Sequence, residues 1–347
     1  MKRTIYFHKE NMMKKTIIAA LVLLLAAGMV FAGGSSDKAA SSAKTQTKVL
    51  QVAFNQSESH PQYKALESFS NAFYEATDGR YKFDIKPNEL LGDQASTIEM
   101  VQDGAIDMSM IGGPLMENFN KDFAVFCLPF IYDNLDHQEK VFTSGLFDDL
   151  FASTEDLGFR VAAALTAGFR SVYTDKPVYT PADLKGYKIR VMQSDTMIAT
   201  LNAMGGIATA MGQGEVYTAI QQGVIEGGEN NEITYNDLKH YEVAPEYTYT
   251  RHLAIPDFLI ISAATYDSMS AEDQATFDTL ATEFAKEEFG LWGDEVEKAK
   301  ANAEANGAHF YDIDTTPFRE ACQSFTDNLL KTDSQKALYK QIRDLAN

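Results

Sequence analysis

Two arginines and an asparagine are the residues in this sequence with the clearest capacity for binding chemistry. Arg170 lies in GFRSVYT, Arg190 lies twenty residues later in LKGYKIRV, and Asn230 closes VIEGGEN. A guanidinium presents a planar fork of donors that matches the two oxygens of a carboxylate, so a site that holds one acid in one orientation favours Arg over Lys. The pattern suggests a clamp for a small organic anion.

The same residues also have a structural interpretation. Arg170 could pair with an interior carboxylate, Glu226 or Glu229, and bridge a strand to a loop. Ligands of open α/β sheets bind beyond the carboxyl ends of strands. Because Arg190 lies near the end of one predicted strand and Asn230 follows the next, both could face one crevice.

The charge of the chain narrows the classes of partner. The formal net charge is −19, and the first 32 residues contribute +4, so the remaining chain would carry −23. A surface of this sign repels nucleic acid and anionic lipid. Arginines in so acidic a chain are therefore expected to act locally, against a small anion or a buried carboxylate of the protein itself.

The first 32 residues have the features of a secretory signal peptide. Lys14 and Lys15 precede an eleven-residue apolar run, and residues 30–32 end in the small-residue pattern that signal peptidase needs. The run is shorter than the roughly 20 apolar residues of a membrane span. We expect residues 1–32 to be removed on export to the periplasm, with residues 1–12 open to being a mis-assigned start.

The sequence argues against a disulfide framework, a metal site and catalysis. Its two cysteines lie far apart, and Cys127, flanked by Phe126 and Leu128, is expected to be a buried thiol. The histidines lack metal-ligand spacing, so neither a metal nor another cofactor is predicted. No G-x-S-x-G motif, placeable Ser-His-Asp set or Cys with a plausible base is present, so we expect no enzyme activity.

Strand and helix patterns alternate at the start of the folded part. The predicted elements are a strand at 49–54, a helix from Pro61, a strand at 81–85, a helix at 94–103 and a strand at 106–111. This β-α-β-α-β order implies a parallel sheet flanked by helices, which is an α/β fold.

A second α/β unit follows. Its predicted elements are strands at 160–165 and 171–174 on either side of Gly168, a strand at 187–191, a helix at 215–222 and a short strand at 224–226 that leads into Gly227 and Gly228. Those glycines allow a close backbone approach.

Roughly 300 residues follow the polar stretch at 33–47, which we expect to be a flexible tether. They are enough for two domains of ordinary size. Ser270 and Asp273 form a capping box that opens a helical pattern running to about Asn306. At about 1.5 Å per residue, such a helix would measure some 50 Å and could lie across both domains.

Several ordered segments of this sequence resemble one protein family. It is similar to the substrate-binding proteins of tripartite ATP-independent periplasmic (TRAP) transporters, of the DctP type, over nearly the whole chain after residue 32. The segments that carry the resemblance are FNQSESHP, ELLGD, AVFCLPF, GFRSVYT, DLKGYKIRV, GEVYTAIQQGVIEGGEN and YEVAPEYTYTRH.

The resemblance implies a role for each candidate residue. Arg190 resembles the arginine that pairs bidentately with the ligand carboxylate, Arg170 the second cationic donor, and Asn230 the amide that completes the carboxylate's surroundings. Asn55 stands where relatives place a donor to the far part of the ligand. Gln213 stands where sialic-acid-type members have an aromatic residue, and favours a hydroxylated ligand such as a sugar acid.

The resemblance also implies a periplasmic-binding-protein-like fold, with two α/β domains joined by hinge strands and a long helix spanning both. We place domain I at 48–167 plus 256–295 and domain II at 168–255 plus 296–347. The domains would close on the ligand and deliver it to a small and a large membrane subunit.

The ligand class has alternatives at this stage. A uronate or aldonate is favoured, but the same clamp could bind a C4-dicarboxylate or a 2-oxo acid. A ligand-sensing receptor would have an identical binding site and would differ only in its downstream partner.

Overall fold

The computed structural model describes residues 46–346. The predicted signal peptide at 1–32, and residues 33–45 of the predicted tether, lie outside the described residues. Within 46–346, every helix is too short or too polar to cross a membrane.

The described residues form one mixed sheet of nine strands in the order β2-β1-β3-β8-β4-β7-β5-β6, with β9 paired to β8. The strands are β1 (Lys48–Ala53), β2 (Tyr81–Lys86), β3 (Met108–Gly112), β4 (Phe159–Thr174), β5 (Lys188–Val191), β6 (Ile207–Ala210), β7 (Gly227–Asn230), β8 (Glu246–Ser262) and β9 (His309–Asp312).

Two groups of parallel strands flank an antiparallel centre. β1 pairs in parallel with β2 and β3, which confirms the parallel sheet expected from the opening β-α-β-α-β order. β5 pairs in parallel with β6 and β7. The long antiparallel strands β4 and β8 pair with each other between the two groups. β8 also pairs with β3 of the first group, and β4 also pairs with β7 of the second.

The prediction of two separate strands around Gly168 was wrong. Residues 159–174 form the single strand β4, which pairs with β8 along its length and shifts register between Thr166 and Phe169. Gly168 has a φ of 63° at this irregularity. A glycine in the left-handed region interrupts the side-chain alternation, so the sequence indicates a break where the backbone makes a bulge.

The predicted strand at 224–226 is also displaced, because the observed strand β7 is Gly227–Asn230. The glycines do serve a close approach, but to a neighbouring strand. A Cβ atom at Gly227 would stand 2.1 Å from the carbonyl oxygen of Tyr173 in β4. The GGEN segment is therefore a strand that needs glycine to lie against β4.

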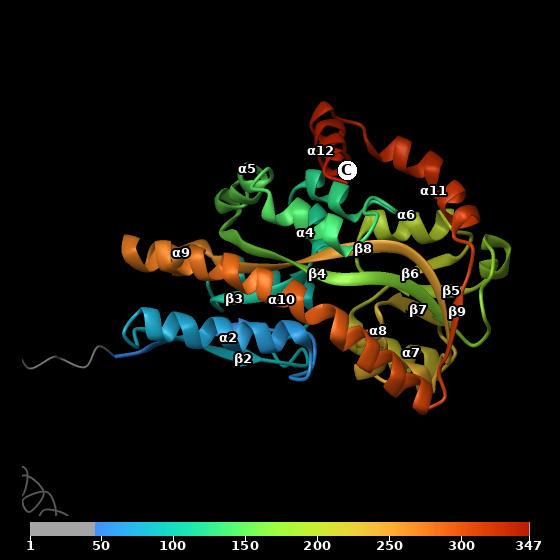
Figure 1. Ribbon diagram of the computed structural model, residues 1–347, viewed down its shortest axis with the longest axis horizontal. Coiled ribbons are helices and arrows are strands. Elements are labelled where there is room, and N and C mark those ends of the chain that lie inside the picture. Colours follow the sequence, from blue (N-terminus) through green and yellow to red (C-terminus); the bar gives the residue numbers. More distant parts are fainter. Residues whose placement is uncertain (1–45, 347) are drawn as a thin grey trace, which may run out of the picture. The chain divides into compact units, whose positions relative to one another are not determined.

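Helices cover the sheet, and α10 is the longest of those in residues 46–346 (Figure 1). They are α2 (Pro61–Ala76), α3 (Gln94–Gln102), α4 (Leu135–Thr143), α5 (Asp148–Ala152), α6 (Asp195–Ala203), α7 (Val216–Gln221), α8 (Glu232–Asp237), α9 (Ala263–Asp267), α10 (Ala271–Ala305), α11 (Thr316–Leu329) and α12 (Asp333–Asp344).

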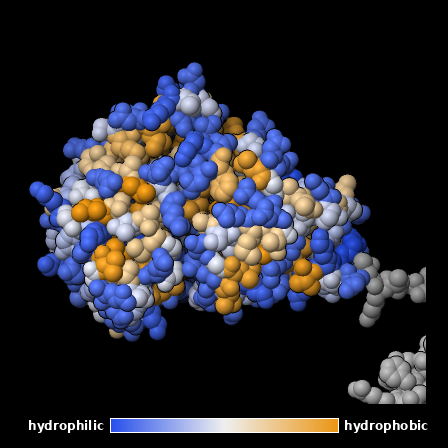
Figure 2. Space-filling view, turned by 180° about the vertical axis from the view of Figure 1, so that it is seen from behind, coloured by the Kyte–Doolittle hydropathy of each residue, from blue (hydrophilic) through white to orange (hydrophobic). Residues whose placement is uncertain are grey.

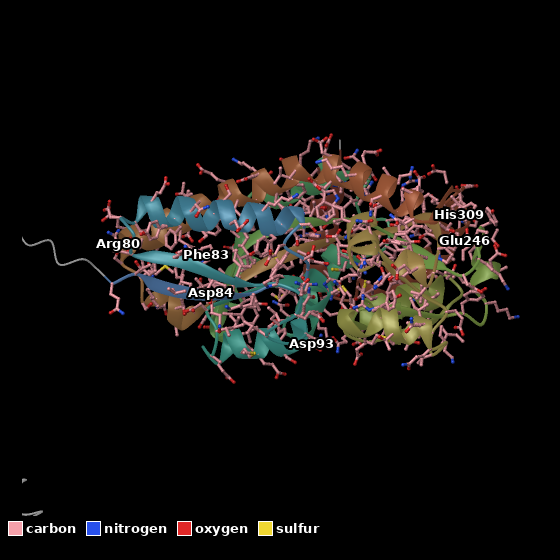
Figure 3. All side chains as sticks on the ribbon, turned by 90° about the horizontal axis from the view of Figure 1, so that it is seen from below. Arg80, Phe83, Asp84, Asp93, Glu246 and His309 are labelled. Carbon is pink, nitrogen blue, oxygen red and sulfur yellow. The ribbon has the colours of Figure 1, made fainter. Side chains whose placement is uncertain are left out.

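Helix α10 confirms the expected long helix, and its N-cap is Ser270, whose side chain accepts a hydrogen bond from the Asp273 N–H. It packs against α2, β4 and α8 in turn, so it contacts elements beside both parallel groups (Figure 1). Its first turn is held by an ion pair between Arg80 and Asp273 of 2.6 Å. Figure 3 labels Arg80 at one end of the molecule and His309, on the strand after α10, at the other.

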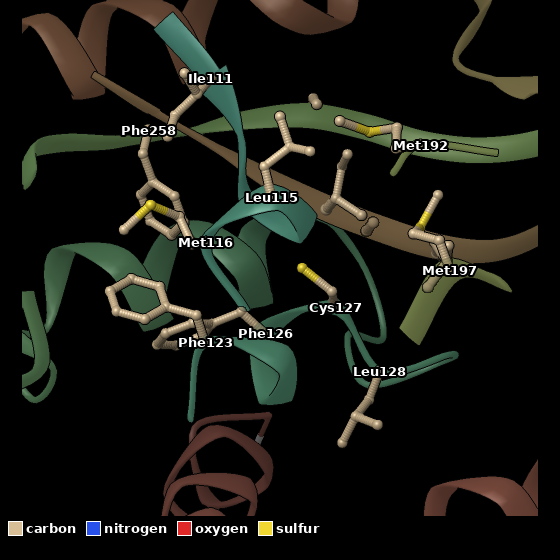
Figure 4. Packing of buried hydrophobic residues seen from close by; sticks show 14 of the residues in the cluster. Ile111, Leu115, Met116, Phe123, Phe126, Cys127, Leu128, Met192, Met197 and Phe258 are labelled. Atoms are coloured by element: carbon tan, nitrogen blue, oxygen red, sulfur yellow. The ribbon is translucent and has the colours of Figure 1, made fainter. Parts of the chain in front are cut away.

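The two largest hydrophobic clusters lie on opposite faces of the sheet. Leu259 and Ile261 of β8 belong to one, while the alternating Phe258 and Ile260 belong to the other. Cys127 is buried in the second cluster, as Figure 4 shows, and its thiol is free, as expected. Figure 2 shows one outer face that is mostly hydrophilic, with hydrophobic side chains in small separate groups.

The final helix bears on the expected domain boundary. α12 packs against the short helical segment η2 (Lys121–Cys127), and α11 packs against α6. The segment 296–347 was assigned to domain II, yet α12 contacts a segment assigned to domain I. The division of the chain into two domains therefore stays a proposal.

The bulge at Gly168 gives a test of the fold. A Cβ atom there would lie 2.6 Å from the indole Nε1 of Trp292, and the left-handed φ adds strain. We predict that Gly168→Ala lowers the free energy of unfolding by about 2–4 kcal/mol, measured by chemical denaturation.

Gly290 provides the matched control, because it lies within α10 with no atom near its Cβ position. Gly290→Ala should leave stability unchanged or raise it by up to about 1 kcal/mol. Equal effects of the two substitutions would contradict the packing described for Gly168.

Candidate ligand-binding site

Arg190 is a buried cation at the carboxyl end of β5. Its side chain is 3% exposed, and its Nε and Nη2 atoms donate to the carbonyl oxygen of Met211 at 3.1 and 3.0 Å. The ion pairs found among residues 46–346 do not include Arg190. Burial lowers the pKa of this guanidinium, and the neighbouring Arg170 lowers it further. The carboxylates of Glu229 and Glu89 oppose this lowering only in part.

Arg170, in β4, is buried but neutralised. Its Nε donates to Glu229 Oε2 at 2.5 Å, and its Nη2 donates to Glu229 Oε1 at 2.8 Å and to the Glu229 carbonyl oxygen at 2.6 Å. Val172 of β4 lies opposite Glu229 of β7. This register brings the side chain of Arg170, two residues before Val172, close to that of Glu229. The structural pairing left open by the sequence is thus present, with Glu229 and not Glu226.

The charges of this pair follow from its geometry. Burial alone would raise the pKa of Glu229, but Arg170 outweighs it and, with His252, holds that pKa at about 2. Burial likewise opposes the charge of Arg170, and Glu229 reverses the effect and raises the pKa of the guanidinium. Both groups are ionised, and their opposite charges cancel.

Asn230 ends β7 beside this pair. Its Oδ1 accepts from Arg170 Nη1 at 2.9 Å and from the Asn231 N–H at 3.0 Å. Since the oxygen is occupied, the amide nitrogen is the end of Asn230 that remains for a ligand. Arg170 therefore orients this amide as well as contributing charge.

Two adjoining cavities bring the predicted residues together. The first is lined by Arg190 and Gln213 and by two carboxylates, Glu89 and Asp93, of which Figure 3 labels Asp93. The second is lined by Arg170, Asn230, Asn55 and again Gln213. The cavities share Gln94, Met192 and Gln213.

The cavities lie where loops from the two parallel groups meet. Gln213 Nε2 donates to Gln56 Oε1 at 3.0 Å, and Gln56 Nε2 donates to Thr234 Oγ1 at 3.2 Å. The Gly214 N–H donates to Glu89 Oε2 at 3.0 Å. These bonds join the segments after β1 and β2 to those after β6 and β7, so groups distant in sequence face one space.

Asn55 differs in one respect from the expectation of a donor. Its Oδ1, an acceptor, is buried without a hydrogen-bond partner among the described residues. The residue follows β1 and lines the second cavity, and its contact with the far part of a ligand stays a prediction.

Sequence reasoning missed several residues of the second cavity, three of which have a charged or ring side chain. They are His60, the N-cap of α2, Asp257, within the otherwise apolar segment 253–261 of β8, and Trp292 of α10. A charged residue inside the apolar segment 253–261 was a signal for Asp257. Trp292 is the only tryptophan of the chain, and only the packing of α10 on β4 places it here.

Comparison with known proteins identifies relatives of this chain. Residues 52–333 match the family model DctP, described as bacterial extracellular solute-binding protein, family 7. The protein YiiZ of Salmonella typhimurium strain LT2, described as uncharacterized, is 34% identical over 86% of this chain and 92% of its own length. YiaO of Escherichia coli K12, named a 2,3-diketo-L-gulonate-binding periplasmic protein, is 29% identical over 82% of this chain and 87% of its own.

Solved structures agree with these relatives. A TRAP periplasmic solute-binding protein from Anaerococcus prevotii with bound D-glucuronate has a TM-score of 0.84 and 34% identity, covering 86% of this chain and 98% of its own. One from Bradyrhizobium in complex with D-galacturonate has a TM-score of 0.83 and 31% identity, covering 86% of this chain and 100% of its own. The resemblance noted in the sequence and the expected fold class are confirmed.

The buried pair between Arg170 and Glu229 yields a prediction. Glu229→Gln leaves the guanidinium without a counter-ion, so we expect the free energy of unfolding at neutral pH to fall by about 3–5 kcal/mol. The lowered pKa of Glu229 stabilises the fold above its ordinary value of 4.5, and this contribution is lost as the pH falls toward about 2. The difference between wild type and variant should therefore shrink between pH 5 and pH 2, as measured by urea denaturation.

Glu226→Gln is the control, because the half-buried Glu226 only accepts the Lys188 N–H, which an amide oxygen can also accept. Its cost should stay below about 1 kcal/mol. A cost for Glu229→Gln that is as small, or that does not change with pH, would contradict the pairing.

Proposed function

Because the chain belongs to family 7 of the bacterial extracellular solute-binding proteins, we propose that it captures a sugar acid, such as a uronate or an aldonate, for a TRAP transporter. Arg190 would bind the ligand carboxylate, with Asn230 and Arg170 completing its surroundings. Gln213 and Asn55 would contact the remainder of the ligand. The bound uronates of the similar structures support this class of solute.

One observation carries the proposal: the buried guanidinium of Arg190 forms no ion pair with a carboxylate of the described residues, although Glu89 and Asp93 line the same cavity. A ligand carboxylate would supply the missing charge, and the fork geometry would fix its orientation. Arg170 cannot fill this role alone, because Glu229 occupies most of its donors. A sensing receptor would use the same chemistry, and nothing in the described residues favours it over transport.

The proposal includes a conformational step. Domain I (48–167 plus 256–295) and domain II (168–255 plus 296–347) would close on the ligand by bending β4 and β8. The bulge beside Gly168 supports this division, and the hydrogen bond from Gln213 to Gln56 would help to hold the closed form. The closed form would be recognised by the small and large membrane subunits, after export to the periplasm through a cleaved signal peptide.

Arg190 provides the direct test. We predict that Arg190→Ala weakens binding of D-glucuronate by about two to three orders of magnitude, because the ligand carboxylate would be buried unpaired. Arg190→Lys should lose nearly as much, since it keeps the charge but not the fork. Isothermal titration calorimetry on protein freed of bound ligand by refolding gives both values.

Arg170→Ala separates the two arginines, because it leaves Glu229 buried and unpaired. It should lower the free energy of unfolding by about 3–5 kcal/mol, whereas Arg190→Ala breaks no ion pair and should cost much less. Wild-type affinity in Arg190→Ala would rule out the clamp.

A further inference from the structure

Three polar side chains of the second cavity are more than nine-tenths buried and have unused hydrogen-bonding capacity. Asn55 is 8% exposed, His60 1% and Asp257 7%, and all three line the cavity. Among the described residues, Asn55 Oδ1 and His60 Nε2 have no hydrogen-bond partner. Buried polar atoms without partners are rare in native proteins, so each points to a role.

The tautomer of His60 follows from its position. Its Nδ1 accepts the N–H of Gln62 at 3.3 Å as the N-cap of α2, so Nδ1 carries no proton. Burial, and then the charge of Lys64, lower the pKa of the ring to about 3, and the neutral ring carries its proton on Nε2. His60 therefore presents a donor, Nε2–H, that needs an acceptor.

Asp257 presents the opposite requirement. Its Oδ2 accepts from Gln62 Nε2 at 2.9 Å, and no hydrogen bond to Oδ1 is found within residues 46–346. Gln62 thus fixes both neighbours, His60 through its backbone and Asp257 through its side chain. The second cavity, which Arg190 does not line, thus has two acceptors, on Asn55 and Asp257, and one donor, on His60.

We propose that His60 and Asp257, with Asn55, recognise neutral hydroxyl groups at the end of the ligand away from Arg190, and exclude a second carboxylate there. A hydroxyl both donates and accepts, so it can satisfy Asp257 or Asn55 and accept from His60. A carboxylate only accepts, and it would meet the like charge of Asp257 in a buried site. The site therefore selects a polyhydroxylated monocarboxylate over a dicarboxylate.

This inference rests on the proposed function and refines it, so the probes are chosen to test the two separately. D-Glucuronate carries one carboxylate, and D-glucarate is the same carbon chain with its C1 oxidised to a second carboxylate. Calorimetry on refolded protein gives the dissociation constant of each. We expect wild type to bind glucuronate at least about 100-fold more tightly than glucarate.

Two variants test the residues individually. Asp257→Asn keeps an acceptor for Gln62 but removes the charge, and should reduce the glucuronate preference at least about 10-fold, mainly by improving glucarate binding. His60→Asn keeps a side-chain oxygen that can cap α2 but removes the Nε2 donor, and should weaken glucuronate binding about 10-fold. Trp292, which packs edge-on against His60 with ring centroids 5.7 Å apart, gives a fluorescence readout of the same titrations.

Glu288→Gln is the control, because it removes a buried carboxyl group that lies outside the two cavities. Glu288 of α10 is fully buried and accepts the Thr166 N–H at 3.1 Å, but it does not line either cavity. Its substitution should leave the preference between the two acids unchanged.

The outcomes distinguish the two claims. An unchanged preference in both Asp257→Asn and His60→Asn, with binding still lost in Arg190→Ala, would overturn this inference and leave the proposed function standing. Tighter binding of glucarate than glucuronate by wild type would overturn it too. A wild-type protein that binds neither acid would overturn the proposed function and this inference with it.

Discussion

The site contains two buried guanidinium groups, and only one of them, Arg170, forms an ion pair, with the ionised Glu229. Glu229 accepts hydrogen bonds from Arg170 through both carboxylate oxygens and its backbone carbonyl oxygen, so the charges of this pair cancel. Arg190 forms no ion pair among the described residues: its guanidinium donates to the Met211 carbonyl oxygen, Arg170 opposes its charge, and Glu229 and Glu89 favour it from a longer range. An unpaired buried charge costs several kcal/mol, and an anionic ligand can relieve that cost. Under the proposed function, this charge imbalance, which the fold maintains, would give the site its affinity for an acid.

The sheet maintains this imbalance by placing each residue on a different strand. Arg170, Arg190 and Asn230 stand on β4, β5 and β7, which are neighbours in the sheet. β4 and β8 also belong to the other parallel group, and the bulge at Gly168 lies where β4 passes from one group to the other. The element that carries the neutralised arginine therefore also connects the two sides of the site.

The sequence predicted local structure better than it predicted contacts between residues far apart in the chain. The capped long helix, the opening parallel strands and the buried Cys127 depend on short-range patterns, and the structure agrees with them. The continuity of β4 was missed because a left-handed glycine looks the same in sequence whether it ends a strand or makes a bulge. β7 was misplaced because two glycines carry no strand signal until a neighbouring backbone is known.

Among the site residues, too, those marked by local patterns were predicted, and those placed by contacts between distant elements were missed. Arg190, Asn230 and Asn55 were found through segments near strand ends and through the family resemblance. The choice of Glu229 over Glu226 as partner of Arg170 depends on the antiparallel register of β4 and β7, which no local pattern encodes. His60 and Asp257 line one cavity because α2 packs near β8, where Gln62 hydrogen-bonds to both of them. Contacts between elements distant in sequence are thus what the residues alone could not supply.

A crystal structure of the protein with bound D-glucuronate would test the central claim most directly. The account predicts that both carboxylate oxygens of the ligand lie within hydrogen-bonding distance of the Arg190 guanidinium, while Arg170 remains paired with Glu229. A ligand whose hydroxyl groups face Arg190, with its carboxylate held elsewhere, would contradict it.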